Sequence, residues 1–175
     1  LKINPKNPKF WSNKLLNLNY NENLSCEYIF NQHKLFDEQF SYLNKNNIKN
    51  RIKNNRLRIG YVSADFRKHS VAYFIKALFK NHNTRLIETF CYYNNYIIDE
   101  TTELLKTYCE NWRSIFEMDD KDVFRKIKDD SIDILVDLSG HTPGNKLLVF
   151  ALKAAPIQIT YLGYPNTTGL STMDY

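Results

Sequence analysis

The side chains best suited to chemistry follow an alternating apolar run, LRIGYV, at Leu57–Val62. Asp65, Arg67, Lys68 and His69 stand together after this run, and an amphipathic helical pattern begins directly behind them. An imidazole can transfer a proton near neutral pH, and an acidic side chain can orient the imidazole. Positively charged side chains attract anions. Loops between a parallel strand and a helix are where such sheets bind ligands. His69 is therefore a candidate site residue, and the alternative is a loop histidine satisfied by the backbone.

Two later segments have the same character, Ser139–Asn145 (SGHTPGN) and Gly163–Gly169 (GYPNTTG). Each follows an apolar run and contains glycine, proline and small polar residues, which permit close approach of the backbone to a ligand. His141 has two readings here, because it can contact a ligand or cap the helix that follows. Asp137 precedes it within an apolar run, where hydrogen bonds to neighbouring loops are expected and a role in the site stays open.

Several familiar chemistries lack their sequence patterns. No Gly-x-Gly-x-x-Gly follows the first strand, no phosphate-binding P-loop pattern is present, and no cluster of histidine, cysteine and acidic residues has metal-ligand spacing. A serine–histidine–acid arrangement of Ser63, His69 and Asp65 is disfavoured, because the chain has no nucleophile elbow.

Strands and helices alternate from residue 56 onward, which predicts an α/β fold with a parallel, doubly wound sheet. The expected strands are Leu57–Val62, Leu86–Tyr93, Trp112–Ile115, Ile132–Leu138 and Ile157–Leu162. The expected helices are Val71–Asn81, Asp99–Glu110 and Asp119–Asp129. The three candidate loops then all fall at the carboxyl ends of strands, and so on one rim of the sheet.

Residues 1–55 read as a separate helical arm, and residues 56–175 as the α/β domain. Ser25 is expected to cap the second arm helix. His33 lies within that helix and is interpreted as a surface or packing residue, and His82 as an exposed residue near a helix end. The first helix is expected to bury Phe10, Trp11, Leu15, Leu16 and Leu18, and the second Tyr28, Ile29, Phe30, Leu35, Phe36 and Phe40.

Composition sets broad limits on the 175-residue chain, whose formal net charge is +5. Most of the excess charge lies in Lys45–Arg58, which predicts a solvated linker, with nucleic-acid binding as the alternative. The three cysteines have no metal-like spacing and fit a reducing compartment. No apolar stretch is long enough to cross a membrane and no signal peptide is recognisable, so a cytoplasmic location is expected. The chain lacks an initial methionine, which suggests a piece of a longer protein.

The motifs of residues 57–175 resemble, in order, the catalytic region of the O-linked N-acetylglucosamine transferase family, including its SPINDLY-type members. The matching segments are LRIGYVSADFRKHSVAYF, FCYYNN, IDILVDLSGHTPGNKLLVFALKAAPIQITYLGYPNTTGL and MDY. The arm, with FWSNKLLNLNYNENLSCEYIFNQHKLF, resembles the helical segment that joins the tetratricopeptide repeats of this family to its catalytic part.

The resemblance implies the Rossmann-like N-terminal lobe of a GT-B glycosyltransferase, which transfers N-acetylglucosamine from UDP-GlcNAc to protein serine and threonine hydroxyls. The reaction would be inverting, need no metal and use no cofactor beyond the nucleotide sugar. The alternatives are an O-fucosyltransferase that uses GDP-fucose, or a non-catalytic protein-binding module. The implied partners are acceptor proteins and a nucleotide sugar, without membrane or nucleic acid, and the chain alone is expected to be inactive.

Carried over by position, the resemblance also assigns residues to the site. His69 is the implied catalytic residue and is expected near the reacting groups. The resemblance does not establish whether it acts as the general base. Gly163, Tyr164 and Pro165 match the loop that approaches the donor sugar and the acceptor. His141 and Thr142 match a loop on the same rim.

Overall fold

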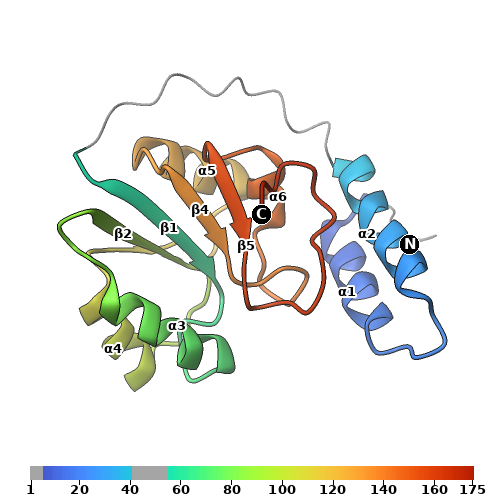
Figure 1. Ribbon diagram of the computed structural model, residues 1–175, viewed down its shortest axis with the longest axis horizontal. Helices are drawn as coiled ribbons and strands as arrows, with labels where there is room; N and C mark the ends of the chain where they lie inside the picture. The colour runs from blue at the N-terminus through green and yellow to red at the C-terminus, as the bar shows by residue number, and fades with distance from the viewer. Residues whose placement is uncertain (1–5, 41–54) are drawn as a thin grey trace.

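A computed structural model describes residues 6–40 and 55–175 of the chain. Its centre is a sheet of five parallel strands in the order β3-β2-β1-β4-β5 (Figure 1). This confirms the predicted α/β class. The strands are β1 (Leu57–Ser63), β2 (Ile87–Tyr93), β3 (Asn111–Ser114), β4 (Ile134–Asp137) and β5 (Ile157–Thr160).

Two strands, β4 and β5, are shorter than the sequence predicts by two residues or more. β5 ends at Thr160 rather than at Leu162, because the N–H of Gly163 donates to the carbonyl of Tyr161 across 2.7 Å. This three-residue turn gives Leu162 a φ of 63°, in the left-handed region that non-glycine residues rarely occupy. β4 starts two residues later than expected, and Asp133, just before it, accepts from the N–H of Arg58 with its carboxylate.

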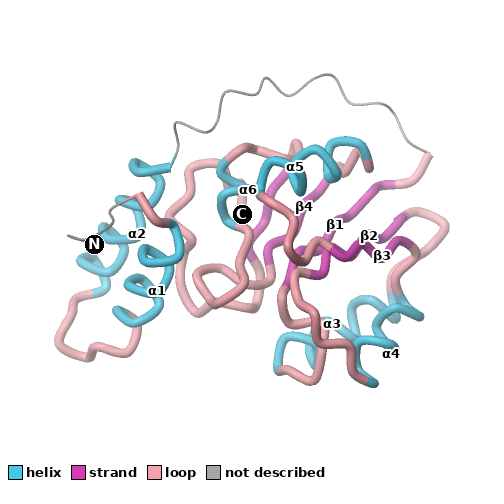
Figure 2. The backbone as a smooth tube through the Cα atoms, turned by 180° about the vertical axis from the view of Figure 1, so that it is seen from behind, coloured by secondary structure: helices cyan, strands magenta, loops and turns pink. Residues whose placement is uncertain are grey.

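Helices cover both faces of the sheet (Figures 1 and 2). α3 (Ser70–Asn81) and α4 (Glu100–Tyr108) share one hydrophobic cluster with Tyr61, Cys91 and Tyr93. α5 (Asp120–Asp129) and α6 (Leu147–Ala151) share the other cluster with Tyr92 and Leu135. Because neighbouring residues of a strand point to opposite faces, Tyr92 and Tyr93 fall into different clusters. Both faces are thus buried, as a parallel sheet requires.

The arm consists of α1 (Pro8–Leu18) and α2 (Cys26–Phe40), which lie beside α6 and the loop after β5 (Figure 1). Ser25 accepts a hydrogen bond from the N–H of Tyr28, which confirms the predicted cap. The predicted buried faces need correction, since four of the expected residues are exposed: Phe10, Tyr28, Phe30 and Leu35. The buried stripe of α2 is instead Ile29, His33, Phe36 and Phe40. This spacing of four, three and four residues is the narrow face that packs on the α/β domain.

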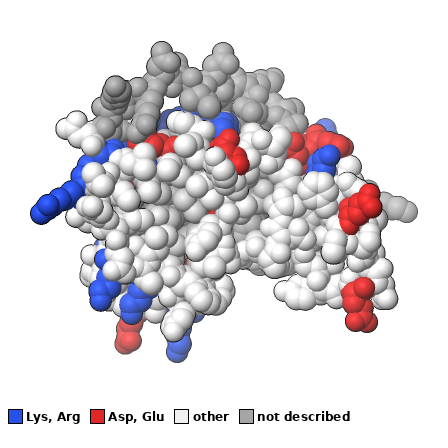
Figure 3. All heavy atoms as spheres, in the orientation of Figure 1, with Lys and Arg blue, Asp and Glu red and all other residues white. Residues whose placement is uncertain are grey.

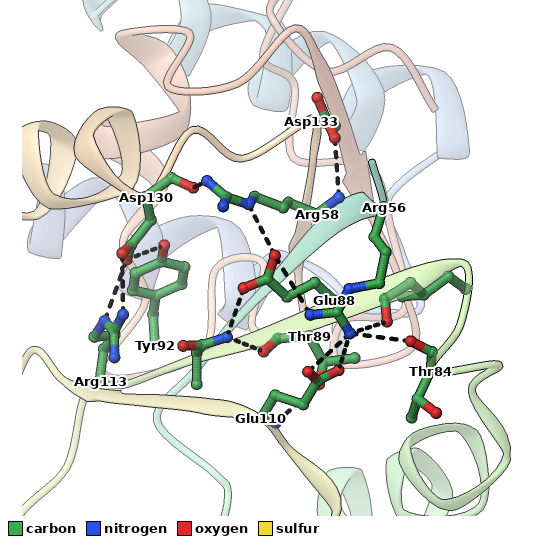
Figure 4. A network of polar contacts seen from close by, with 12 residues as sticks. Arg56, Arg58, Thr84, Glu88, Thr89, Tyr92, Glu110, Arg113, Asp130 and Asp133 are labelled. Atoms are coloured by element: carbon green, nitrogen blue, oxygen red, sulfur yellow. Dashed lines mark hydrogen bonds and ion pairs between the residues drawn. The ribbon is translucent and has the colours of Figure 1, made fainter. Parts of the chain in front are cut away.

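The amino-terminal ends of β1 and β2 carry a polar network (Figure 4). Asp133 accepts from the N–H of Arg58 at 2.9 Å, and the Nε of Arg58 donates to Glu88 at 3.0 Å. Arg56 is paired with Glu110 at 2.9 Å. The two described arginines of the basic stretch are therefore neutralised at the edge opposite the candidate site. Residues 45–54 of that stretch, which were predicted to form a solvated linker, lie outside the described residues.

The same network reaches β3 and α5 through Asp130 (Figure 4). Asp130 receives hydrogen bonds from Arg113 at 3.1 Å and from the Tyr92 hydroxyl at 2.8 Å. Burial, followed by the negative charge of Asp130, raises the pKa of Tyr92. The Tyr92 hydroxyl therefore stays protonated and acts as a donor.

The face of the molecule seen in Figure 3 has its charged side chains near its borders, while its middle is almost free of them. Within residues 6–40 and 55–175, no helix is both long and apolar enough to cross a membrane.

Candidate functional site

The loops that leave the carboxyl ends of the strands are joined to one another by side-chain amides. Asn94, after β2, donates from Nδ2 to the carbonyl of Gly144 at 2.9 Å, and Asn95 donates to the carbonyl of Ala64 at 2.9 Å. These two bonds tie the loop after β2 to the loops after β4 and β1. The predicted rim therefore exists, and the loop after β2 belongs to it as well.

The loop after β1 has a defined shape. The N–H of Asp65 donates to the Ser63 hydroxyl at 2.9 Å, and Arg67 is paired with the Asp65 carboxylate at 3.2 Å. The N–H of Lys68 donates to Asp99 at 2.7 Å, and this bond is the main reason that the pKa of Asp99 is lowered. Ser63 is buried, and its hydroxyl oxygen is engaged in this turn.

His69 is the N-cap of α3, and its Nδ1 accepts from the N–H of Val71 at 3.3 Å. Its side chain is 38% exposed. The Asp65 carboxylate lies 3.9 Å from the same nitrogen. While Nδ1 accepts from Val71, the proton of the neutral ring sits on Nε2. His69 thus combines a backbone contact, as one reading predicted, with an exposed ring that presents a donor.

An open concavity lies next to this loop. It is lined by Lys68, Ile98, Asp99, Glu100 and Glu103, from the loop after β1, the loop after β2 and the start of α4. It gives the rim an exposed hollow beside Lys68, lined by apolar, acidic and basic side chains.

The loop after β4 is held in place by Asp137, which is buried at the end of that strand. Its carboxylate accepts from the backbone N–H groups of Ser139 and Gly140 at 3.1 and 2.8 Å, and from the Thr160 hydroxyl at 3.0 Å. Burial raises the pKa of Asp137, and these three bonds counteract the rise. The expected bonds to neighbouring loops are confirmed, and Asp137 fixes the positions of two loops at once.

His141 is fully buried, and it does not cap α6, whose N-cap is Lys146. The Ser12 hydroxyl of α1 lies 3.1 Å from its Nδ1, and its Nε2 is 2.9 Å from the carbonyl of Thr168. Since a carbonyl only accepts, Nε2 donates and Nδ1 accepts from Ser12. The neighbouring Thr142 is half-buried and donates its hydroxyl to the carbonyl of Ser139. The capping interpretation of His141 is therefore wrong, and the ring links the arm to two loops of the rim.

Lowering the pH is expected to destabilise the protein through His141. Burial lowers the pKa of this ring from 6.5 to about 3, and the neighbouring His33 adds to the decrease. Below pH 6.5 the unfolded chain therefore binds a proton at His141 that the folded chain does not bind. The free energy of unfolding falls as the pH decreases from 6.5 toward 3. At pH 5 the loss is about 2 kcal/mol.

Urea unfolding at pH 7.5 and pH 5 measures this loss. His141→Gln is the matched variant, because its amide can still donate to Thr168 but does not titrate in this range. The difference in the free energy of unfolding between pH 7.5 and pH 5 is expected to be about 2 kcal/mol smaller in the variant. An equal pH dependence in both proteins would contradict the assignment.

The loop after β5 is pressed against its neighbours. A Cβ atom on Gly163 would lie 1.6 Å from the carbonyl oxygen of Leu138, so only glycine fits there. Gly140 has a φ of 52°, and a Cβ atom on it would lie 2.3 Å from the Cβ of Tyr164. Pro165, which follows, is exposed. Gly163, Tyr164 and Pro165 are thus held on the rim beside the loop after β4.

The arm supplies residues that sequence reasoning did not place in the site. The Tyr164 hydroxyl lies 2.8 Å from the Nε2 of His33 and 2.8 Å from the Nδ2 of Asn19. His33 is fully buried, as its position in the apolar stripe of α2 allows, so it is a packing residue that also reaches the rim. His82 was expected to be exposed but is half-buried, with its Nε2 2.8 Å from the Tyr61 hydroxyl.

No group of three or more metal-ligating side chains gathers in the part of the chain that the structure describes. The donors on the rim include backbone amides, hydroxyls, the side-chain amides of Asn94 and Asn95, and the imidazole of His69. Such groups bind polar, uncharged or anionic ligands through hydrogen bonds.

Comparison with known proteins gives a family match and related chains. The family described as glycosyl transferase family 41 matches residues 21–175. A tomato (Solanum lycopersicum) protein named "Probable UDP-N-acetylglucosamine--peptide N-acetylglucosaminyltransferase SPINDLY" is 36% identical, with the match covering 100% of this chain and 20% of that protein. A Caenorhabditis elegans UDP-N-acetylglucosamine--peptide N-acetylglucosaminyltransferase is 36% identical, with 69% of this chain and 11% of that protein covered.

A solved structure is similar along the whole chain. It is a K341M mutant of the Thermobaculum terrenum O-GlcNAc transferase, with a TM-score of 0.93 and 30% identity. The match covers 100% of this chain and 34% of that one. The chain therefore spans about a fifth of the tomato relative and a third of the solved one.

Proposed function

The chain belongs to glycosyl transferase family 41, and we propose that it forms the arm and the N-terminal lobe of a protein O-glycosyltransferase. The main support is the likeness to SPINDLY proteins over the entire chain, with each candidate loop placed at one rim of the sheet. Because the chain spans only a fifth of those relatives, the complete activity requires further protein on the other side of the rim.

The proposed reaction moves N-acetylglucosamine from UDP-GlcNAc to a serine or threonine hydroxyl of a protein. The hydroxyl oxygen bonds to the anomeric carbon while the bond from that carbon to the diphosphate breaks, and UDP leaves with the electron pair. Attack from the face opposite the leaving group inverts the configuration. The hydroxyl proton passes to solvent or to a base, and no metal takes part. The rim contributes mainly by positioning the two substrates.

His69 is proposed to act in this reaction as a hydrogen-bond donor. Its Nδ1 is occupied by the N–H of Val71, so the neutral ring carries its proton on Nε2 and offers a donor to the substrates. A donor at this point can stabilise negative charge that grows on the leaving group or orient the acceptor. A general-base role would first require the bond to Val71 to break.

The donor sugar has an alternative, GDP-fucose, because the loop GYPNTTGL of Gly163–Leu170 resembles the SPINDLY type. The relatives, however, are named after UDP-N-acetylglucosamine, and this favours UDP-GlcNAc. A screen of the full-length protein with UDP- and GDP-sugars decides between them. Release of UDP from UDP-GlcNAc in the presence of acceptor peptides is expected. Release of GDP from GDP-fucose alone would move the assignment to fucose.

Non-catalytic alternatives make different predictions. A protein-binding module would hold acceptor proteins without consuming any nucleotide sugar in the same screen. Nucleic-acid binding is disfavoured, because Arg56 and Arg58 are paired with Glu110 and Glu88. Nucleic-acid binding would appear as an association constant for DNA or RNA that falls steeply as the salt concentration rises. A cytoplasmic location is proposed from the three cysteines, which are all free.

The 175-residue chain by itself is expected to show negligible transfer, because the rim provides only one wall of the substrate cleft. Comparison of product formation by the isolated chain and by the full-length protein, at equal concentrations, measures this. Turnover by the chain alone that approaches the full-length rate would contradict the two-lobe arrangement.

A further inference from the structure

The hydroxyl of Tyr164 is the point at which the arm holds the loop after β5. It is bonded to His33 of α2 and to Asn19 at the end of α1, each at 2.8 Å. Asn19 also accepts from Asn166 of the same loop at 2.8 Å. Both arm helices therefore contact the loop that contains Gly163 and Pro165.

The chemistry of the partners fixes the direction of each bond. The Nδ1 of His33 lies 2.7 Å from the carbonyl of Ile29, which can only accept, so Nδ1 carries the proton. The Nε2 of a neutral His33 therefore accepts, and the Tyr164 hydroxyl donates to it while it accepts from Asn19. Burial lowers the pKa of His33 and raises that of Tyr164 to about 12, so both groups stay neutral.

Close packing prevents the loop from moving without the arm. A Cβ atom on Gly169 would lie 2.1 Å from the carbonyl oxygen of His33, so the loop backbone rests directly on α2. On its other side, the Tyr164 side chain rests on Gly140 of the loop after β4. The loop with Gly163 and Pro165 is thus held between the arm and the loop after β4. This arrangement, in which His33 and Asn19 bind the Tyr164 hydroxyl, is called the clamp below.

We propose that His33 and Asn19 are positioning residues, which act through the Tyr164 hydroxyl to hold the loop Gly163–Pro165 in the geometry that transfer requires. The role in transfer rests on the proposed function. Neither arm residue is assigned contact with the substrates. Removing the clamp lowers turnover because the loop samples other positions, not because a chemical group is lost.

Two substitutions at one position separate the clamp from simple packing. His33→Gln places an amide oxygen near the position of Nε2 and can still accept from Tyr164. His33→Asn places its amide near Nδ1, where it can donate to Ile29, but leaves the Tyr164 hydroxyl without its acceptor. Tyr164→Phe removes one oxygen atom and breaks both bonds. Tyr161→Phe is the control, because Tyr161 is 51% exposed and lies just before the same loop.

The test measures amide hydrogen exchange over residues 161–170 of the full-length protein, together with kcat and KM for the sugar donor. Tyr164→Phe and His33→Asn are each expected to speed exchange and to lower kcat by about tenfold, the upper range for one hydrogen bond. His33→Gln and Tyr161→Phe are expected to stay near the unmodified protein. The double variant Tyr164→Phe/His33→Asn should be no worse than Tyr164→Phe, because Tyr164→Phe already breaks the bond that His33→Asn removes.

Unchanged exchange in Tyr164→Phe would overturn the clamp, whatever the turnover. Faster exchange with unchanged kcat and KM would show a purely structural contact and would overturn the positioning role. If the unmodified full-length protein transfers no sugar, the proposed function fails and the positioning role falls with it. The exchange data then still decide whether the arm holds the loop.

Discussion

Replacement of His69 by asparagine is expected to lower kcat of the full-length protein about 100-fold, within the range for loss of a positioned catalytic group. Stability should change little, because His69 is the N-cap of α3 and asparagine is a good cap. Its amide oxygen can accept from Val71 in place of Nδ1, so only the Nε2 donor is lost. Steady-state kinetics and urea unfolding of the same variant measure the two effects.

His69→Ala provides the comparison, since it removes both the cap and the donor. It is expected to lose the same activity and, in addition, about 1 kcal/mol of stability. A His69→Asn protein with normal kcat would remove His69 from the mechanism. Equal stability losses in the two variants would contradict its role as a cap.

Gly163→Ala is expected to cause the largest loss of stability, about 3 kcal/mol or more, together with loss of transfer. The added Cβ would lie 1.6 Å from the carbonyl oxygen of Leu138. Since the backbone fixes the position of a Cβ atom and its partner is a backbone carbonyl, no rotamer change can relieve the overlap. The loop must move away from β4, and misplacement by about 1 Å can lower the rate about 100-fold. Thermal unfolding and transfer kinetics measure the two losses.

Ser139→Ala is the matched control for this contact. Ser139 follows Leu138, and its buried hydroxyl oxygen has no hydrogen-bond partner among the described residues. Its removal is expected to leave stability unchanged or slightly higher. If Gly163→Ala were as stable as Ser139→Ala, the close contact of the two loops would be refuted.

The order and type of the strands and helices could be predicted because each carries its own local pattern. β1, β2 and α3 have strong periodicity and clear ends, and their residues agree closely with expectation. The end of β5 could not be predicted, because the left-handed conformation of Leu162 has no local sequence pattern of the usual kind. The buried faces of the arm helices depend on which side meets α6 and the loop after β5, and amphipathic periodicity alone does not fix this.

The candidate site was predictable where it depended on topology. Loops after parallel strands must meet at one rim, and this placed His69 and the loops around His141 and Gly163 together. The contacts of His33 and Asn19 with Tyr164 join residues far apart in the sequence, so no local pattern indicated them. Only the spacing of His33 with Ile29, Phe36 and Phe40 hinted that it is buried. Roles of these residues in substrate binding remain predictions.

The mass of acceptor peptides after incubation with the full-length protein and UDP-GlcNAc tests the central claim most directly. A library of serine- and threonine-containing peptides serves as the acceptor, with the His69→Asn protein as the control. The account predicts a gain of N-acetylhexosamine on hydroxyl side chains, strongly reduced with the variant. No sugar gain with UDP-GlcNAc, GDP-fucose or any other nucleotide sugar would contradict it.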